Sequence, residues 1–310
     1  MKSVSAVIKL IRWPNLLFIF LTQLLFWYFV IPFAFLVSHS GYETTKLTGN
    51  LFFLLTLASV LIASAGYIIN DYFDVDIDQV NKSSKVIIGT LIKKRSAILL
   101  HAFLSAAGLM LSIYVGIRLN NYYIIFFNFL SIVLLWLYST TFKKKLLIGN
   151  VLISLLTAWV ILVLALAEYR FRISATDIVW QRILKVSFLY AGFAFIISLV
   201  REVIKDMEDI EGDSRFDCTT MPIVWGIQAA KVFAGVWLVV LVLLILAILI
   251  YILQFGWWYV SLYSVVTIVA PSLWLLRKLA DANTSADYHQ LSKSIKLIML
   301  AGILSMIFFW

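Results

Sequence analysis

Nine long runs of apolar residues divide this chain and set the main limit on what it can fold into. Most of the runs reach the ~20 residues that a helix needs to cross hydrocarbon. They do not alternate as transmembrane β-strands do, and backbone groups in lipid must pair within their own segment, so helices are expected. The sequence therefore predicts an all-α, polytopic membrane protein with about nine transmembrane helices. The runs lie near residues 15–38, 50–70, 96–117, 122–139, 147–167, 184–204, 232–254, 256–276 and 295–310.

The number of helices has two open alternatives. The last run is short, and the runs on either side of Gly256 nearly join, so eight or ten helices also fit the pattern. The first run follows basic residues, as in a signal peptide, but its ~24 apolar residues exceed the usual ~7–15, and no small-residue cleavage site closes it. We therefore expect a first transmembrane helix with Pro14 in its first turn and a kink at Pro32.

Composition agrees with a membrane protein and argues against other classes. Hydrophobic residues make up 63% of the chain and charged residues 13%, against ~25% charged residues in an average soluble domain. Such a chain has too few charges to cover the surface of a water-soluble enzyme, and it is too apolar to be disordered. Cys218 is the single cysteine, which excludes a disulfide scaffold. We expect residues 1–310 to form one transmembrane domain.

Basic residues are distributed unevenly between alternate loops. The chain has 25 Lys and Arg against 16 Asp and Glu, a formal charge of +9. With nine helices, the side that includes the N-terminus receives 19 of these basic residues and the other side receives 6. The positive-inside rule then predicts a multi-pass protein of the cell membrane with its N-terminus in the cytoplasm. Topology thus explains the net charge, and no nucleic-acid partner is expected.

The acidic residues are scarce and clustered. Eleven of the 16 lie in two windows, 71–78 and 202–217, and both windows follow a predicted helix on the cytoplasmic side. At ~100° per residue, Asn70, Asp71, Asp74 and Asp78 share one helix face, while Asp76 lies opposite. The two windows begin about 135 residues apart, which hints at a duplicated half.

The acids of the second window are likewise predicted to lie mainly on one face of a helix. Glu202, Asp206, Asp209 and Asp213 share a face, provided that the helix continues past Gly212. The remaining acids of the two windows are expected to be solvated bystanders: Asp76, Glu208, Glu211 and Asp217.

Like charges at these spacings repel each other, and carboxylates at a membrane helix are costly, so a cation is expected to offset them. Mg²⁺ prefers oxygen ligands and combines one or two carboxylates with water and phosphate oxygens. Ordinary solvated loop acids are the alternative, but two windows with one phase on one membrane side favour a metal–diphosphate site. Nearby basic residues would offset diphosphate charge. The pattern therefore predicts a Mg²⁺ site on these two helix faces.

These residues also carry a family resemblance. Asn70-Asp71-x-x-Asp74-x-x-x-Asp78 resembles the first signature of the UbiA-type intramembrane prenyltransferases, and Lys205-Asp206-x-x-Asp209-x-x-x-Asp213 resembles the second. Four further stretches are similar to family segments: 12–15, 81–85, 138–143 and 219–226.

The resemblance implies one transmembrane prenyltransferase domain over residues 1–310, with its helices around a central cavity. The implied Mg²⁺ ligands are Asn70, Asp74 and Asp78, which would face Asp206, Asp209 and Asp213 across this cavity. It implies Mg²⁺-dependent transfer of a polyprenyl group from a polyprenyl diphosphate donor to a lipophilic acceptor in the bilayer, with release of diphosphate on the cytoplasmic side. Its implied catalytic residues are Asp71, Lys143, Arg201 and Lys205. Its implied substrate-binding residues are Arg12, Asn15, Lys82, Lys85 and Tyr138.

The acceptor has two candidates. The second signature looks most like the branch of the family that transfers geranylgeranyl to geranylgeranylglyceryl phosphate, a precursor of ether lipids. Prenylation of an aromatic quinone precursor is the alternative, because those relatives share a similar Lys-Asp-x-x-Asp-x-x-Gly-Asp segment.

A cation-coupled transporter is the alternative from another class. Transporter cation sites lie near the bilayer midplane on broken helices. Here the acids lie at predicted helix ends, and the run 232–254 contains no charged residue. The pattern therefore favours diphosphate chemistry near the membrane surface.

Overall fold

The computed structural model describes residues 2–37, 45–81, 86–169 and 178–309. Over these ranges the chain is helical, and its extended pairing is limited to one isolated bridge between Ile88 and Ile92. Within the same ranges, nine helical segments are long and apolar enough to cross a membrane, which confirms the predicted number. They are Trp13–Leu36, Gly49–Phe73, Lys94–Arg118, Tyr122–Thr140, Ile148–Glu168, Ile178–Glu208, Ile227–Leu253, Trp258–Asp281 and Ser285–Phe309.

Two boundaries settle the alternatives of eight and ten helices for the described ranges. Gly256 has a left-handed backbone (φ +78°), so the chain turns there and the two adjoining runs are separate helices. The last segment begins at Ser285, ten residues before the apolar run at 295. The apolar pattern missed its first turns because they carry Asp287, His289 and Lys293.

The chain divides into two compact units, and each is described by itself. One unit comprises Met1–Phe142 and Trp159–Phe188, and the other comprises Lys143–Ala158 and Leu189–Trp310. The prediction of one domain over 1–310 stays a prediction, as does the central cavity.

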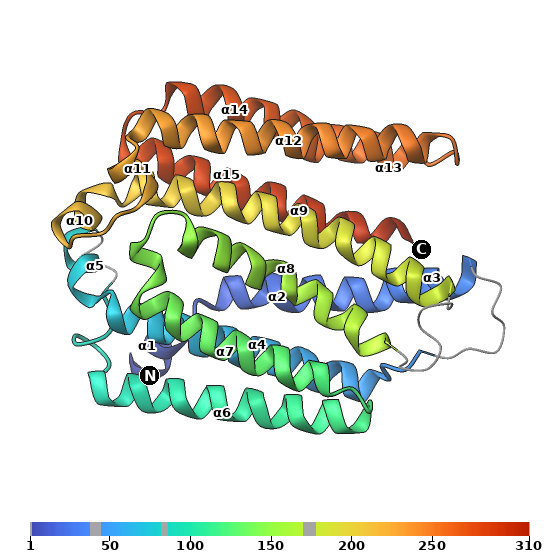
Figure 1. Cartoon of the computed structure of the whole chain (residues 1–310), viewed down its shortest axis with the longest axis horizontal. Helices are drawn as coiled ribbons and strands as arrows, with labels where there is room; N and C mark the ends of the chain where they lie inside the picture. The colour runs from blue at the N-terminus through green and yellow to red at the C-terminus, as the bar shows by residue number, and fades with distance from the viewer. Residues whose placement is uncertain (1, 38–44, 82–85, 170–177, 310) are drawn as a thin grey trace. The chain divides into compact units, whose positions relative to one another are not determined.

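In the first unit, α4 (Gly49–Phe73) packs against α6 (Lys94–Arg118) and α7 (Tyr122–Thr140), which also contact each other (Figure 1). The backbones of α4 and α6 approach closely at Gly108, where a Cβ atom would lie 2.8 Å from Ile62 Cγ1 and 3.2 Å from the Ala58 carbonyl oxygen. Small residues allow such close approach of membrane helices. This packing fixes α4, whose C-terminal end carries the first acid window.

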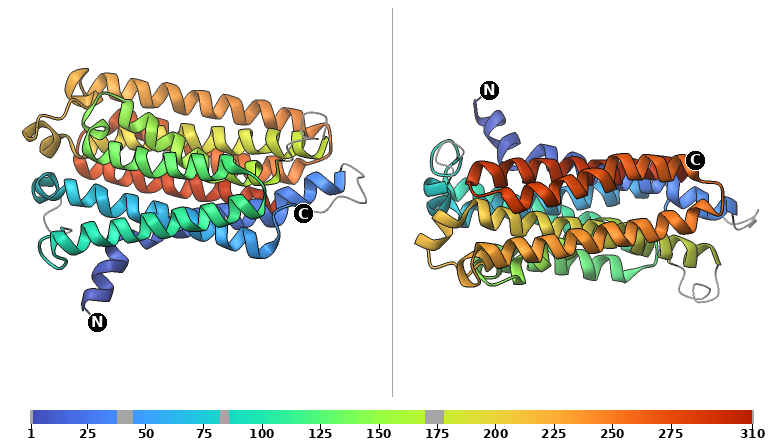
Figure 2. Two further views of the ribbon diagram at one scale, coloured as in Figure 1. Left: turned by 60° about the horizontal axis from the view of Figure 1, so that its bottom comes forward. Right: turned by 90° about the horizontal axis from the view of Figure 1, so that it is seen from above.

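The N-terminal segment is broken just before the first span. α1 (Lys2–Leu10) and α2 (Trp13–Leu25) are separated at Arg12, which has a left-handed backbone with φ 52° and ψ 52°. Both views in Figure 2 show α1 directed away from α2. Pro14 lies in the first turn of α2, as predicted.

Two prolines in the interior of spans follow π-helical segments. η1 (Phe26–Val30) leads into α3 (Ile31–Val37), which contains Pro32, and η4 (Val265–Val269) leads into α14 (Ala270–Asp281), which contains Pro271. Proline lacks an N–H, and its ring clashes with the carbonyl four residues earlier. A wider turn ahead of each proline accommodates this clash.

Glu168 ties the end of α8 (Ile148–Glu168) to the segment ahead of α4. Its buried carboxylate accepts hydrogen bonds from Thr45 Oγ1 at 2.5 Å, Lys46 N at 2.9 Å and Leu47 N at 3.0 Å. A buried carboxylate is tolerated when such donors satisfy it.

We expect Glu168→Leu to lower the free energy of unfolding by about 2 kcal/mol or more, because the backbone N–H groups of Lys46 and Leu47 lose their acceptor and each unsatisfied buried group costs about 1–3 kcal/mol. Thr45→Val removes one donor and should cost less. Unfolding of the two variants in detergent checks this order; equal stability of Glu168→Leu and the wild type would contradict it.

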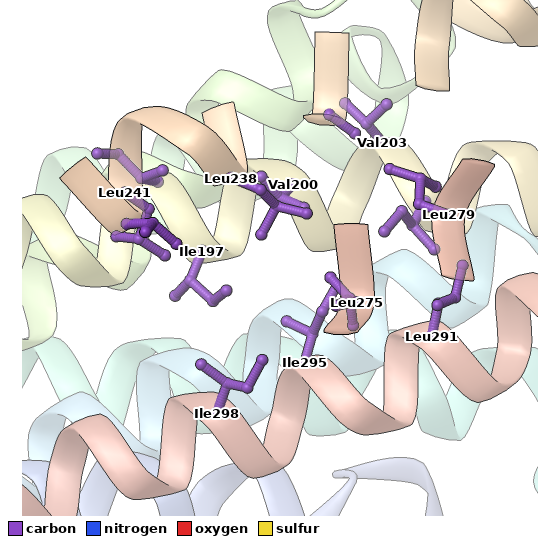
Figure 3. Close-up of a cluster of buried hydrophobic side chains, with 14 of the residues drawn as sticks. Ile197, Val200, Val203, Leu238, Leu241, Leu275, Leu279, Leu291, Ile295 and Ile298 are labelled. Carbon is purple, nitrogen blue, oxygen red and sulfur yellow. The ribbon is translucent and has the colours of Figure 1, made fainter. Parts of the chain in front are cut away.

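In the second unit, apolar side chains, mainly from four helices, form one buried cluster (Figure 3). Ile197 and Val200 of α9 (Ile178–Glu208) meet Leu238 and Leu241 of α12 (Ile227–Leu253). α14 and α15 (Ser285–Leu304) complete the cluster with Leu275, Leu279, Leu291, Ile295 and Ile298. This core holds the part of α9 that carries the second acid window. The unit also contains α10 (Ile210–Arg215), α11 (Met221–Val224), α13 (Trp258–Ser264) and η5 (Ser305–Phe309).

Candidate active site

The first acid cluster lies where α4 ends. The helix breaks at Asp74 (φ −91°, ψ −3°), and α5 (Val75–Asn81) follows directly. The Asp74 N–H donates to Asn70 O at 3.0 Å, and the Asp78 N–H donates to Asp74 O at 2.8 Å, so the helical phase continues through the break. Asn70, Asp71, Asp74 and Asp78 are half-buried, whereas Asp76 is exposed. The predicted separation of Asp76 from the other acids is confirmed.

Asn70 and Asp74 are joined side chain to side chain. Asn70 Nδ2 donates to Asp74 Oδ2 at 2.7 Å. Asn70 Oδ1 is buried and has no hydrogen-bond donor among the described residues. A buried acceptor without a donor is costly, and a metal ion would satisfy it. The two side chains together offer only oxygen atoms to such an ion, which suits Mg²⁺.

Arg12 holds the neighbouring acid. Its guanidinium donates to Asp71 Oδ1 at 2.5 Å and lies over the Tyr67 ring, 5.3 Å from the ring centroid. Burial lowers the pKa of Arg12, but the charge of Asp71, helped by Tyr67 and Asp78, more than offsets this effect and raises the pKa above its ordinary value. Arg12 therefore stays charged and neutralises Asp71.

For the other predicted substrate-binding residues of this unit, the structure gives only the position and burial of two. Asn15 lies half-buried in the first turn of α2, three residues after Arg12. Tyr138 is half-buried in the last turns of α7. Lys82 and Lys85 lie outside the described residues.

The second acid cluster repeats the local geometry of the first. α9 ends at Glu208, Asp209 breaks the helix (φ −98°, ψ 7°), and α10 follows. The Asp209 N–H donates to Lys205 O at 2.9 Å, and the Asp213 N–H donates to Asp209 O at 3.1 Å. The predicted continuation of the helix past Gly212 is thus confirmed, with a break at one residue.

Glu202 organises the basic residues of this cluster. It is buried and accepts from Arg201 Nη1 at 2.7 Å and from Lys205 Nζ at 3.4 Å. Placing both cations against one buried carboxylate fixes their side chains. Both are predicted catalytic residues, and Glu202 positions them.

Asn150 is a residue of this cluster that the sequence analysis missed. Its Nδ2 donates to Asp206 Oδ2 at 2.8 Å, from the first turn of α8. A single Asn inside an apolar run gives no signal by itself. The only available signal was the spacing of 135 residues, which pairs Asn150 with Asn15.

The loop that carries Lys143 is attached to the segment after the second cluster. Thr219 donates to Lys144 O from its backbone N at 2.7 Å and from Oγ1 at 2.9 Å. The Cys218 N–H donates to Asp213 O at 3.1 Å. Lys143 and the aspartates of this unit are therefore linked through one short stretch of backbone. Burial, together with the charge of Asp213, raises the pKa of the Cys218 thiol, so Cys218 stays uncharged.

The prediction that Glu208 is a solvated bystander is wrong. Its side chain is 7% exposed, and its Oε1 accepts from His289 Nδ1 at 2.9 Å. Ser285 Oγ also donates to Glu208 O at 3.0 Å. The first turns of α15 cover this end of α9, and the apolar pattern had placed no helix there. Glu211 and Asp217 are exposed, as predicted.

We expect Glu208→Ala to lower the free energy of unfolding by about 1 kcal/mol, because it removes a hydrogen bond between α9 and α15. Glu211→Ala removes only an exposed pair with Arg215 and should cost at most about 0.5 kcal/mol. Unfolding both variants in the same detergent checks the difference, and equal losses would contradict the structural role of Glu208.

The ligand set of the two clusters fits Mg²⁺. Within the described ranges, no three His, Cys, Asp or Glu side chains lie together closely enough to form a complete metal site. Mg²⁺ typically takes only one or two protein carboxylates and fills its other positions with water and phosphate oxygens. Each cluster belongs to a different unit, so the expectation that they face each other stays a prediction.

These features define a multi-pass membrane protein with an acidic cluster at the end of its second and of its sixth span. The chain belongs to the UbiA prenyltransferase family, whose model matches residues 26–297. It is a prenyltransferase, and this finding favours an enzyme over the transporter alternative.

Curated relatives agree with the family. The digeranylgeranylglyceryl phosphate synthase of Methanocaldococcus jannaschii is 31% identical over 280 residues, which cover 88% of each chain. The protein of the same name from Methanothermobacter thermautotrophicus is 33% identical, and its alignment covers 61% of this chain and 62% of the relative.

Solved structures agree with the fold. A structure of digeranylgeranylglyceryl phosphate synthase in membranes has a TM-score of 0.61 at 24% identity, covering 99% of both chains. A UbiA homolog from Archaeoglobus fulgidus bound to DMAPP and Mg²⁺ has a TM-score of 0.57 at 14% identity, covering 97% of this chain and 99% of that chain.

Proposed function

We propose that the protein transfers a geranylgeranyl group from its diphosphate to geranylgeranylglyceryl phosphate, releases diphosphate and depends on Mg²⁺. The observation that carries the proposal is the pair Asn70 and Asp74, which offers oxygen ligands and a buried oxygen without a donor in a member of a prenyltransferase family. Support for the acceptor comes from the relatives, which are named digeranylgeranylglyceryl phosphate synthases.

Mg²⁺ would be held by Asn70, Asp74 and Asp78 in one unit and by Asp206, Asp209 and Asp213 in the other. The chemistry it supplies when bound is neutralisation of diphosphate charge, which makes diphosphate a better leaving group. The protein's own cations add to this effect. Lys143, Arg201 and Lys205, with Lys82 and Lys85, would bind diphosphate oxygens and stabilise the negative charge that develops on them.

The transfer breaks the bond between the allylic carbon of the donor and its diphosphate oxygen. The acceptor hydroxyl oxygen forms the new ether bond to that carbon and loses its proton to the released diphosphate. Arg12 and Asn15 would bind the acceptor, and Arg12 holds Asp71 in place beside it. Apolar helices around the reacting carbon would exclude water, which would otherwise hydrolyse the donor.

We also propose that the enzyme works at the cytoplasmic face of the cell membrane. Support comes from the basic residues, of which 19 of 25 fall on the side that carries both acid clusters.

The identity of the acceptor can be tested by offering several candidate acceptors to the purified protein. The protein is reconstituted in vesicles with geranylgeranyl diphosphate, Mg²⁺ and either geranylgeranylglyceryl phosphate, 1,4-dihydroxy-2-naphthoate or 4-hydroxybenzoate. Mass spectrometry of the products should show prenylation of the glyceryl phosphate. A product from one of the aromatic acids alone would replace the ether-lipid acceptor by a quinone precursor.

A further inference from the structure

Two stretches of the chain share local backbone features at a constant spacing of 135 residues. Arg12 and Leu147 each lie directly ahead of a membrane span, and both have a left-handed backbone, with φ 52° and φ 55°. A non-glycine residue in this region is uncommon, so the coincidence is informative. Three residues later in each stretch is an asparagine, Asn15 and Asn150.

The same spacing relates the two acid clusters. It pairs Asp71 with Asp206 and Asp78 with Asp213, and it pairs Asp74 with Asp209, which break their helices with nearly the same backbone angles. The hinted duplication therefore extends from the sequence to the local structure.

The first aspartate of each cluster is held from the beginning of another span. Asp71 accepts from Arg12 at the start of α2, and Asp206 accepts from Asn150 at the start of α8. The two contacts differ in charge. Arg12 pairs with Asp71 as an ion pair, whereas Asn150 is a neutral amide, and Asp206 forms no salt bridge within the described part of the chain.

This difference matters for a metal ligand. An arginine partner cancels the carboxylate charge that attracts a cation. A neutral amide donor fixes the orientation of the carboxylate without pairing it with a cation, and such supporting residues typically change metal affinity by ~10–100-fold when they are replaced.

We propose that Asn150 is a positioning residue that holds Asp206 in place as a ligand for the metal–diphosphate complex, while Asp71, neutralised by Arg12, contributes little to metal affinity. The proposal rests on the proposed function, because it assumes that the second acid cluster binds a metal with diphosphate. It adds a division of roles between two aspartates at equivalent positions.

The test compares near-isosteric variants at two polar contacts between the same helices. Asn150→Leu removes the contact with Asp206. Thr157→Val removes the contact of Thr157 Oγ1 with Ser198 Oγ at 3.3 Å, which also joins α8 to α9 but involves no aspartate. EPR of free Mn²⁺ gives the dissociation constant of each protein for Mn²⁺ in the presence of inorganic diphosphate. Stability is measured by unfolding in detergent. The Mg²⁺ requirement is measured as the Mg²⁺ concentration that gives half-maximal transfer.

Asn150→Leu should raise the Mn²⁺ dissociation constant and the Mg²⁺ requirement by ~10–100-fold, and Thr157→Val should leave both unchanged. Asp206→Asn should weaken Mn²⁺ binding far more than Asp71→Asn. If Asn150→Leu does not fold, Asn150→Ser, which keeps a small polar side chain, is measured with the same expectation.

Wild-type Mn²⁺ affinity in Asn150→Leu, an equal loss in Thr157→Val, or an equal loss in Asp71→Asn and Asp206→Asn would overturn the proposal. Wild-type protein that binds no Mn²⁺ with diphosphate would overturn it together with the metal role. The variants could differ in Mn²⁺ binding as expected while the wild-type protein transfers no prenyl group. That result would support the positioning role and contradict only the proposed function.

Discussion

Replacing Asp74 or Asp209 by Asn should lower the rate of prenyl transfer by at least ~100-fold in each case, because each change removes a charged oxygen ligand near a developing diphosphate charge. Asn keeps the shape of the side chain and an acceptor oxygen, so the contact between Asn70 and residue 74 persists. The loss should therefore appear in turnover and not in stability. Transfer of labelled geranylgeranyl by purified variants measures it.

Exposed acids of the same two acid windows, 71–78 and 202–217, serve as controls for these variants. Asp76 and Glu211 are exposed acids within a few residues of Asp74 and Asp209. Asp76→Asn and Glu211→Gln should retain most of the wild-type turnover. Near-normal turnover of Asp74→Asn and Asp209→Asn, or equal losses in all four variants, would refute the assignment of the metal ligands.

Arg12→Leu should cause the largest loss of stability among the site variants, about 1–3 kcal/mol. Breaking a buried pair costs about 3–5 kcal/mol by leaving one charge uncompensated. Here the side chains of Arg12 and Asp71 remain 35% and 19% exposed, so water screens part of that cost. Transfer should fall as well, because the freed Asp71 is no longer held beside Asn70.

A double-mutant cycle isolates this pair. Asp71→Leu removes the carboxylate that Arg12→Leu leaves unpaired, so the double variant should be more stable than Arg12→Leu alone. Unfolding of the four proteins in one detergent gives the coupling energy. Additive losses, with no recovery in the double variant, would show that the contact between Arg12 and Asp71 contributes nothing to the fold.

The membrane spans could be predicted from the sequence because hydropathy is a local property. Each span must satisfy its own backbone and contact lipid, so its length and composition reveal it. The phase of the acids was also predictable, because the helical period places Asp74 and Asp78 on one face and Asp76 on the other. A break at a single residue, Asp74 or Asp209, does not disturb that phase.

Partners from distant segments could not be predicted in the same way. Glu208 lies opposite His289 because the polar first turns of α15 pack against α9, and polar turns leave no apolar signal. Asn150 reaches Asp206 because the start of α8 packs beside α9, and this contact brings the two side chains within hydrogen-bond distance. Both contacts depend on tertiary structure, which local patterns do not encode.

Under the proposed function, diphosphate release and ether-bond formation are one reaction. The most direct measurement counts both products from purified protein in vesicles, with geranylgeranyl diphosphate and geranylgeranylglyceryl phosphate, in Mg²⁺ and after chelation. We predict one diphosphate for each prenylated acceptor in Mg²⁺, and neither product without the metal, without the acceptor or with Asp209→Asn. Diphosphate release without a prenylated acceptor, or transfer that continues after chelation, would contradict the proposed reaction.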